Sequence, residues 1–92
     1  MFVFSAAQVA SHLDALPDWK IDAGVLARTF LFEDFRAALR FVNQVAELAE
    51  EAGHHPDIDI RYNRVRLGLT THDAGGLTAK DFDLAARIDK LR

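Results

Sequence analysis

The sequence predicts an α+β fold, a two-layer sandwich in which a four-stranded antiparallel sheet carries three helices on one face. Apolar residues recur at helical spacing in three segments. In the stretches between these segments, apolar residues alternate with polar residues, as in paired strands. Paired strands separated only by helices indicate an antiparallel sheet, whose apolar face the helices cover. About half of the 92 residues are hydrophobic, so residues 1–92 are expected to form a single domain.

The first helix of the expected order α-β-β-α-β-β-α begins after Ser5. Gln8 follows three residues later, which completes a capping box. Apolar positions continue at helical spacing to Leu16, and Pro17 marks a stop just beyond them.

A β-hairpin comes next, with strands at 19–21 and 25–32 joined by a turn at 22–24. One long amphipathic helix then begins at Asp34. Gly53 is expected to close this helix as the residue that follows its last turn.

The second hairpin shows strict alternation of apolar and polar residues over 57–69. If Asn63-Arg64 forms a two-residue loop, the opposed pairs are Tyr62 with Val65, Ile60 with Leu67 and Ile58 with Leu69. Every apolar residue then faces one side of the sheet. Continued beyond the strands, the same pairing places His55 opposite His72.

The last helix is expected to begin at Thr78, with Asp81 three residues later. A sheet built from these two hairpins keeps at least one unpaired edge in the monomer. Since such edges commonly pair across subunits, we expect a homodimer or a homotetramer.

Charge and composition argue against several classes of partner. The net charge of −3 disfavours direct nucleic acid binding, since domains of that kind usually carry a basic excess. The chain has no cysteine and no apolar run of transmembrane length. We therefore expect a cytoplasmic protein that has no disulfide and does not bind membranes.

Histidines are the candidate catalytic residues. The predicted pairing brings His54, His55 and His72 together, with Glu50 and Asp73 beside them. Because the unperturbed pKa of imidazole lies near neutral pH, such a cluster both donates and accepts protons. A neighbouring carboxylate fixes the tautomer of a histidine or binds a donor-rich ring.

A set of short motifs extends beyond these histidines. Its members are Glu50-Glu51-Ala52-Gly53-His54-His55-Pro56, Tyr62-Asn63, Thr70-Thr71-His72-Asp73, Gly76-Leu77-Thr78 and Asp81, with Trp19 and Phe32-Glu33-Asp34-Phe35 upstream. In these motifs and their spacing the chain resembles the pterin-4a-carbinolamine dehydratases over nearly its full length.

The resemblance implies a dehydratase that converts 4a-hydroxytetrahydrobiopterin, or a related pterin, to quinonoid dihydropterin. Such an enzyme recycles the pterin cofactor of aromatic amino acid hydroxylation and forms a dimer or a dimer of dimers. The resemblance implies neither a metal nor an organic cofactor.

The reaction needs an acid for the departing C4a hydroxyl and a base for the N5 proton. We expect His54, His55 and His72 to be the catalytic residues, with His55 and His72 transferring protons and His54 shaping the site. The residues expected to bind the substrate are Glu50, Thr70, Thr71, Asp73 and, by analogy with the family only, Trp19. Pro56 and Asp81 are expected to support the site, Asp81 mainly by starting the last helix.

Two other functions stay open. Members of this fold family also act as non-enzymatic coactivators or assembly factors that bind other proteins, and this is the main alternative. Three histidines also suit zinc, so a zinc-dependent hydrolase is the second alternative. The cluster of Arg61, Arg64 and Arg66 is interpreted as the solvated face of a hairpin.

Overall fold

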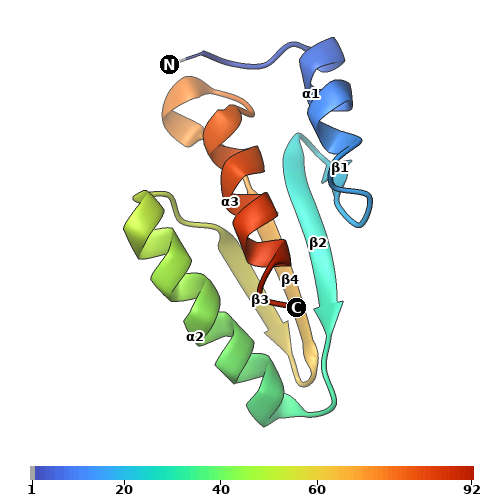
Figure 1. Cartoon of the computed structure of the whole chain (residues 1–92), viewed down its shortest axis with the longest axis vertical. Coiled ribbons are helices and arrows are strands. Elements are labelled where there is room, and N and C mark those ends of the chain that lie inside the picture. Colours follow the sequence, from blue (N-terminus) through green and yellow to red (C-terminus); the bar gives the residue numbers. More distant parts are fainter. Residues whose placement is uncertain (1) are drawn as a thin grey trace.

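The computed structural model describes residues 2–92 and confirms the predicted order of helices and strands (Figure 1). The elements are α1 (Ala6–Leu13), β1 (Lys20–Asp22), β2 (Val25–Leu31), α2 (Phe35–Ala52), β3 (Asp57–Arg61), β4 (Arg64–Leu69) and α3 (Ala79–Asp89). A short 3₁₀ helix, η1 (His72–Ala74), precedes α3 and was not predicted. The strands form one antiparallel sheet in the order β1-β2-β4-β3.

The helices begin where side chains satisfy the first free backbone N–H groups. Ser5 and Gln8 form the predicted capping box of α1, and Thr78 and Asp81 form that of α3. Asp34 caps α2 with its side chain. No helix in the described part of the chain has the length and apolar character needed to span a membrane.

The first helix is shorter than its apolar spacing suggests. α1 ends at Leu13, and the chain continues through a turn in which the N–H of Leu16 donates to the carbonyl oxygen of Leu13 over 2.9 Å. Leu16 is still buried, so this apolar position belongs to the core although it lies outside the helix.

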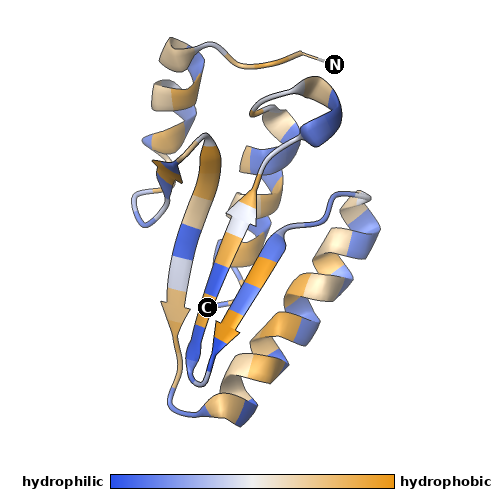
Figure 2. Cartoon of the chain, turned by 180° about the vertical axis from the view of Figure 1, so that it is seen from behind, coloured by the Kyte–Doolittle hydropathy of each residue, from blue (hydrophilic) through white to orange (hydrophobic). Residues whose placement is uncertain are grey.

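The core lies between the sheet and the helices α2 and α3 (Figure 1). Five of the strand residues that face these helices are at most 1% exposed: Leu26, Phe30, Val65, Leu67 and Leu69. α1 lies beyond the end of the sheet near β1, and it adds Val9 and Leu13 to the same core. The opposite face of the sheet carries the arginine cluster around a depression of about 250 Å³. Figure 2 shows hydrophilic and hydrophobic residues alternating along β3 and β4.

The register of the second hairpin differs from the prediction. The loop is Tyr62-Asn63, so Ile60 lies opposite Val65 and each predicted pair is displaced by two residues. A displacement of two keeps all apolar residues on the same face, which is why alternation alone did not reveal it. The tip is fixed by Phe32, whose carbonyl oxygen accepts from the Asn63 side chain and whose N–H donates to the Asn63 carbonyl, both over 2.9 Å.

The sheet has two edges, β1 and β3. β3 is the longer of the two, and its Ile58 and Ile60 are 39% and 36% exposed. An edge with half-exposed apolar side chains favours pairing with a second copy of the chain. The homodimer or homotetramer stays a prediction, for which this edge is the candidate interface.

We predict that the chain sediments as a dimer or tetramer and that Ile60→Lys shifts it toward the monomer. A charge at this half-exposed position of β3 opposes burial against a partner strand. Sedimentation velocity at matched concentrations measures the mass, and Ala10→Lys on the exposed surface of α1 is the control. A wild-type chain that is monomeric at micromolar concentration would contradict the prediction.

Candidate active site

Three histidines line one depression, which lies at the end of the sheet beside the C-terminal ends of α2 and β4. The depression has a volume of about 270 Å³. Its lining residues are Gly53, His54, His55, Thr70, Thr71, His72, Asp73 and Lys80. Apart from Gly53 and Lys80, every one of them is a site residue predicted from the sequence.

The way in which α2 ends gives the two adjacent histidines, His54 and His55, different orientations. Gly53 has a φ of 62°, a left-handed conformation that glycine adopts without steric penalty. The N–H groups of Gly53 and His54 donate back to carbonyl oxygens of the last turn, so the chain leaves the helix sharply. The side chain of His54 then lies inward and is 11% exposed, whereas that of His55 is 64% exposed.

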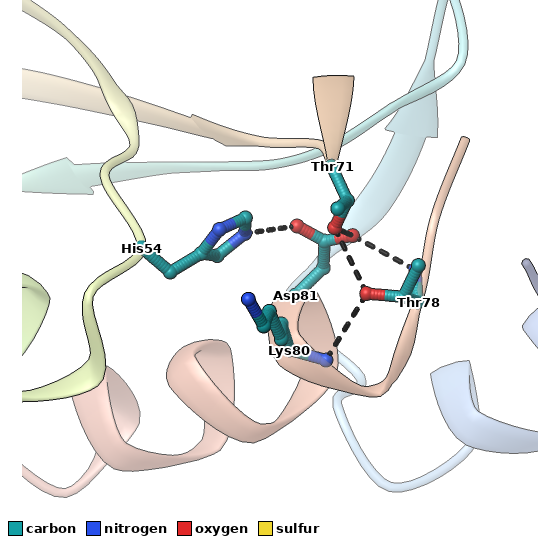
Figure 3. Close-up of polar contacts among 5 residues, drawn as sticks. All are labelled: His54, Thr71, Thr78, Lys80 and Asp81. Carbon is teal, nitrogen blue, oxygen red and sulfur yellow. Dashed lines mark hydrogen bonds and ion pairs between the residues drawn. The ribbon is translucent and has the colours of Figure 1, made fainter. Parts of the chain in front are cut away.

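Asp81 is fully buried and holds His54 (Figure 3). Nε2 of His54 lies 2.6 Å from Oδ1 of Asp81. The second carboxylate oxygen, Oδ2, accepts the hydroxyl of Thr71 over 2.8 Å and the backbone N–H of Thr78 over 2.9 Å. Burial of a carboxylate is costly unless donors surround it, and here donors from three separate segments do so.

The hydrogen-bond network decides which nitrogen of His54 carries the hydrogen. An ionised carboxylate only accepts, so Nε2 of His54 donates the hydrogen of this bond. Thr71 uses its own hydrogen on Asp81, so the hydroxyl of Thr78 donates to Thr71 over 2.9 Å. His54 is therefore held in one orientation, with its Nε2 hydrogen directed at Asp81.

His55 has a carboxylate partner in a very different environment. Its Nε2 lies 2.5 Å from Oε2 of Glu50, in the last turns of α2. The two side chains are 64% and 76% exposed, so water and salt screen this pair strongly. Glu50, which is predicted to bind the substrate, is not among the residues that line the depression, and it contacts His55.

His72 reaches the depression through the loop that follows β4. Thr71 and Gly76 form an isolated β-bridge that closes this loop around η1. The predicted register placed His72 directly opposite His55, and that register was wrong by two residues. The loop nevertheless brings both side chains to the same depression, where His72 is exposed.

Trp19, which is predicted by analogy to bind the substrate, is not among the residues that line the depression. It is 3% exposed, packs against Phe30 and donates from Nε1 to Oδ1 of Asp89 over 2.8 Å. The same oxygen accepts from Arg28 over 2.8 Å. Within this chain Trp19 is a core residue.

Lys80 lines the depression although the sequence analysis did not single it out. It is the second residue of α3, directly before Asp81, in a segment that the sequence marks only as a helix start. Within residues 2–92 no ion pair joins its ammonium group to another side chain. Pro56 is half-buried and leads from His55 into β3, so it lies beside the depression without lining it.

The arrangement gives little support to a zinc site. Within residues 2–92 no group of three or more His, Cys, Asp or Glu side chains is placed to hold a metal ion. Zinc needs its nitrogen and oxygen ligands to converge on one point at roughly 2.0–2.2 Å. Here His54 and His55 each direct Nε2 toward a carboxylate of their own.

Comparison with protein families points to one group of enzymes. The family model described as "Pterin 4 alpha carbinolamine dehydratase" matches residues 3–91. A Chloroflexus aurantiacus protein provisionally named pterin-4-alpha-carbinolamine dehydratase is 62% identical over 87 residues, which cover 95% of this chain and 94% of that protein. A protein with the same provisional name from Acidobacterium capsulatum is 64% identical over 83 residues, 90% of each chain.

Solved structures with this fold have more than one stated role. The crystal structure of a "transcriptional coactivator/pterin dehydratase" from Brucella melitensis superposes with a TM-score of 0.93 at 32% identity and covers 98% of both chains. A pterin dehydratase-like protein described as a RuBisCO assembly factor in the alpha-carboxysome superposes with a TM-score of 0.64 at 27% identity. That match covers 79% of this chain and 84% of the other.

We predict that Asp81→Asn lowers the free energy of unfolding by about 1–3 kcal/mol, because one amide oxygen cannot accept from His54, Thr71 and Thr78 together. Denaturant unfolding followed by circular dichroism measures the change. Asp83→Asn is the matched control, since Asp83 is exposed on the same helix and should change stability by less than about 0.5 kcal/mol. Equal stability of the two variants would show that the buried network contributes nothing.

Proposed function

Because the chain belongs to the pterin-4a-carbinolamine dehydratase family, we propose that it removes water from a 4a-hydroxytetrahydropterin to give a quinonoid dihydropterin. The observation that carries the proposal is the convergence of His54, His55 and His72 on one depression of about 270 Å³. Imidazole suits the reaction because it both donates and accepts protons near neutral pH.

The elimination needs two proton transfers and no change of oxidation state. An acid protonates the C4a hydroxyl, the C4a–O bond breaks and water leaves. The N5 lone pair forms the C4a=N5 double bond, and a base removes the N5 proton. His55 and His72 carry these two transfers, while His54, held by Asp81, orients the substrate.

The other side chains around the depression have positioning roles. Glu50 accepts from Nε2 of His55, so it orients this ring and stabilises its protonated form. The carboxylate of Asp73 suits the amino and ring N–H donors of a pterin. The chain segment at Thr70 and Thr71 lies along the same wall and offers backbone groups to the remaining polar atoms.

In this proposal the substrate is 4a-hydroxytetrahydrobiopterin or a close relative, formed when an aromatic amino acid hydroxylase consumes its pterin cofactor. The enzyme then acts in the cytoplasm, where it returns the cofactor to a reducible form. The reaction moves only protons and water, so histidines suffice and the proposal includes neither a metal nor an organic cofactor.

A non-enzymatic role is the second candidate function. It is favoured by the similarity to the structures described as a transcriptional coactivator/pterin dehydratase and as a RuBisCO assembly factor. A chain that only binds partners has no need of ionisable groups gathered in a depression. This chain keeps three histidines there, two of them joined to carboxylates, which favours catalysis.

We predict that the wild-type chain accelerates the dehydration and that His55→Ala and His72→Ala each slow it by about 10²–10⁴-fold, the usual worth of one positioned proton transfer. A phenylalanine hydroxylase generates the 4a-carbinolamine in the assay, and absorbance follows the quinonoid dihydropterin. His12→Ala is the matched control, because His12 lies on α1 and does not line the depression. A folded wild type that only matches the uncatalysed rate would remove the dehydratase proposal and favour a protein partner.

We predict that Glu50→Gln lowers kcat by up to about tenfold, because a hydrogen bond to a charged acceptor becomes one to a neutral acceptor, and that KM changes little. Glutamine still accepts from His55 but does not stabilise its protonated ring. Glu51→Gln is the control, since Glu51 pairs with Arg87 outside the histidine site. A higher KM with unchanged kcat would instead indicate that Glu50 contacts the substrate directly.

A further inference from the structure

Three arginines gather on the face of the sheet that the helices leave open. Arg61, Arg64 and Arg66 lie on β3 and β4, near the loop that joins these strands. The histidine site adjoins the other ends of the same two strands. Together with Thr29 and Asp59, the three arginines line a depression of about 250 Å³, and none of these five residues lines the histidine site. The arginine cluster is therefore separate from the proposed dehydratase site.

The strand register brings these positive charges close together. Arg61 lies directly opposite Arg64 on the neighbouring strand, and Arg66 follows two residues later on the same face. The Cβ atoms of directly opposed residues are about 4.5–5.5 Å apart, and like charges at such positions destabilise a sheet. A bound anion removes this repulsion, so the arginine cluster favours a negatively charged ligand.

The carboxylates of the chain compensate the arginine cluster only in part. Arg66 donates to Asp22 over 2.8 Å. Arg61 lies 3.5 Å from Asp59, but the two side chains are 76% and 55% exposed, so this ion pair stabilises the fold little. No ion pair within residues 2–92 engages Arg64. Arg61 and Arg64 therefore keep N–H donors available for a ligand.

We propose that this depression binds a small phosphate ester that carries a hydroxyl group. The planar N–H fork of a guanidinium matches two phosphate oxygens, which suits Arg61 and Arg64. Thr29, which lies opposite Arg66 on β2, adds a hydroxyl donor. The carboxylate of Asp59 repels the phosphate but accepts a hydrogen bond from a hydroxyl group beside it. Pockets for small molecules usually enclose roughly 300–1,000 Å³, so a depression of about 250 Å³ suits only a small ligand.

The surroundings of the arginine cluster favour one phosphate group over the backbone of a nucleic acid. Asp59 lies opposite Arg66 and Asp57 lies opposite Gly68, so both carboxylates share the open face. Asp22 contacts Arg66 from the far side. Nucleic acid binding relies on basic side chains that neutralise several successive phosphates. Here the three carboxylates repel any phosphate beyond the first, so the ligand carries a single phosphate group.

An NMR titration with glycerol phosphate tests the proposal, because this ester carries hydroxyl groups next to its phosphate. The Nε–H signals of the arginine cluster report binding, and the wild type should have a Kd on the order of 1 mM, as two charge-assisted hydrogen bonds provide. Arg64→Gln should weaken binding by about tenfold or more. Arg40→Gln removes the same charge from an exposed position on α2 and should leave the Kd unchanged. Circular dichroism checks that each variant is folded.

Two further titrations separate this ligand from other anions. Inorganic phosphate has no hydroxyl-bearing carbon, so it should bind the wild type several-fold more weakly than glycerol phosphate. Asp59→Ala should reduce this preference, because the variant loses the acceptor for the hydroxyl group. A single-stranded oligonucleotide should bind no more tightly than glycerol phosphate.

Each outcome decides the proposal, whether or not the chain is a dehydratase. Saturable shifts of the arginine signals that weaken in Arg64→Gln but not in Arg40→Gln support the site. No saturable binding at millimolar concentration, or equal losses in these two variants, overturns it. Inorganic phosphate that binds at least as tightly as the ester overturns the choice of ligand, and tighter binding of the oligonucleotide overturns it in favour of a nucleic acid.

Discussion

One buried carboxylate ties together the end of the molecule that carries the histidines. Asp81 starts α3, and its oxygens accept from His54 after α2, from Thr71 after β4 and from the backbone of Thr78. A buried charge is tolerated only with a full set of donors. These three segments must therefore place their donors within hydrogen-bond distance of Asp81. The depression around His55 follows from this meeting, because its walls are the chain segments that Asp81 joins.

The helices could be predicted, and so could the face of the sheet to which each strand residue points, because the signals for both are local in the sequence. Capping boxes and apolar spacing act within a few residues, and the structure confirms the starts of α1 and α3. The register of the second hairpin could not be predicted in the same way. Alternation repeats every two residues and permits a displacement by two, whereas the deciding contact joins Asn63 to Phe32 far away in the sequence.

In the candidate site, too, local features could be predicted from the sequence and long-range contacts could not. The motif spacing singles out residues that the fold brings together in one depression, with the histidines among them. Their carboxylate partners depend on tertiary structure, so the sequence did not reveal that Glu50 contacts His55 and that Asp81 contacts His54. Trp19 was assigned by analogy, and its indole is instead engaged by Asp89 within the core.

The first turn of α3 also governs how this end of the molecule opens. Helix ends are usually among the first parts of a protein to unfold locally, because few contacts hold them. Here the capping residues Thr78 and Asp81 also bind Thr71 and His54, so the helix end cannot fray alone. We therefore expect the turn after α2, the loop after β4 and the start of α3 to open as one cooperative unit, so that the histidine site stays assembled for as long as that helix stays anchored.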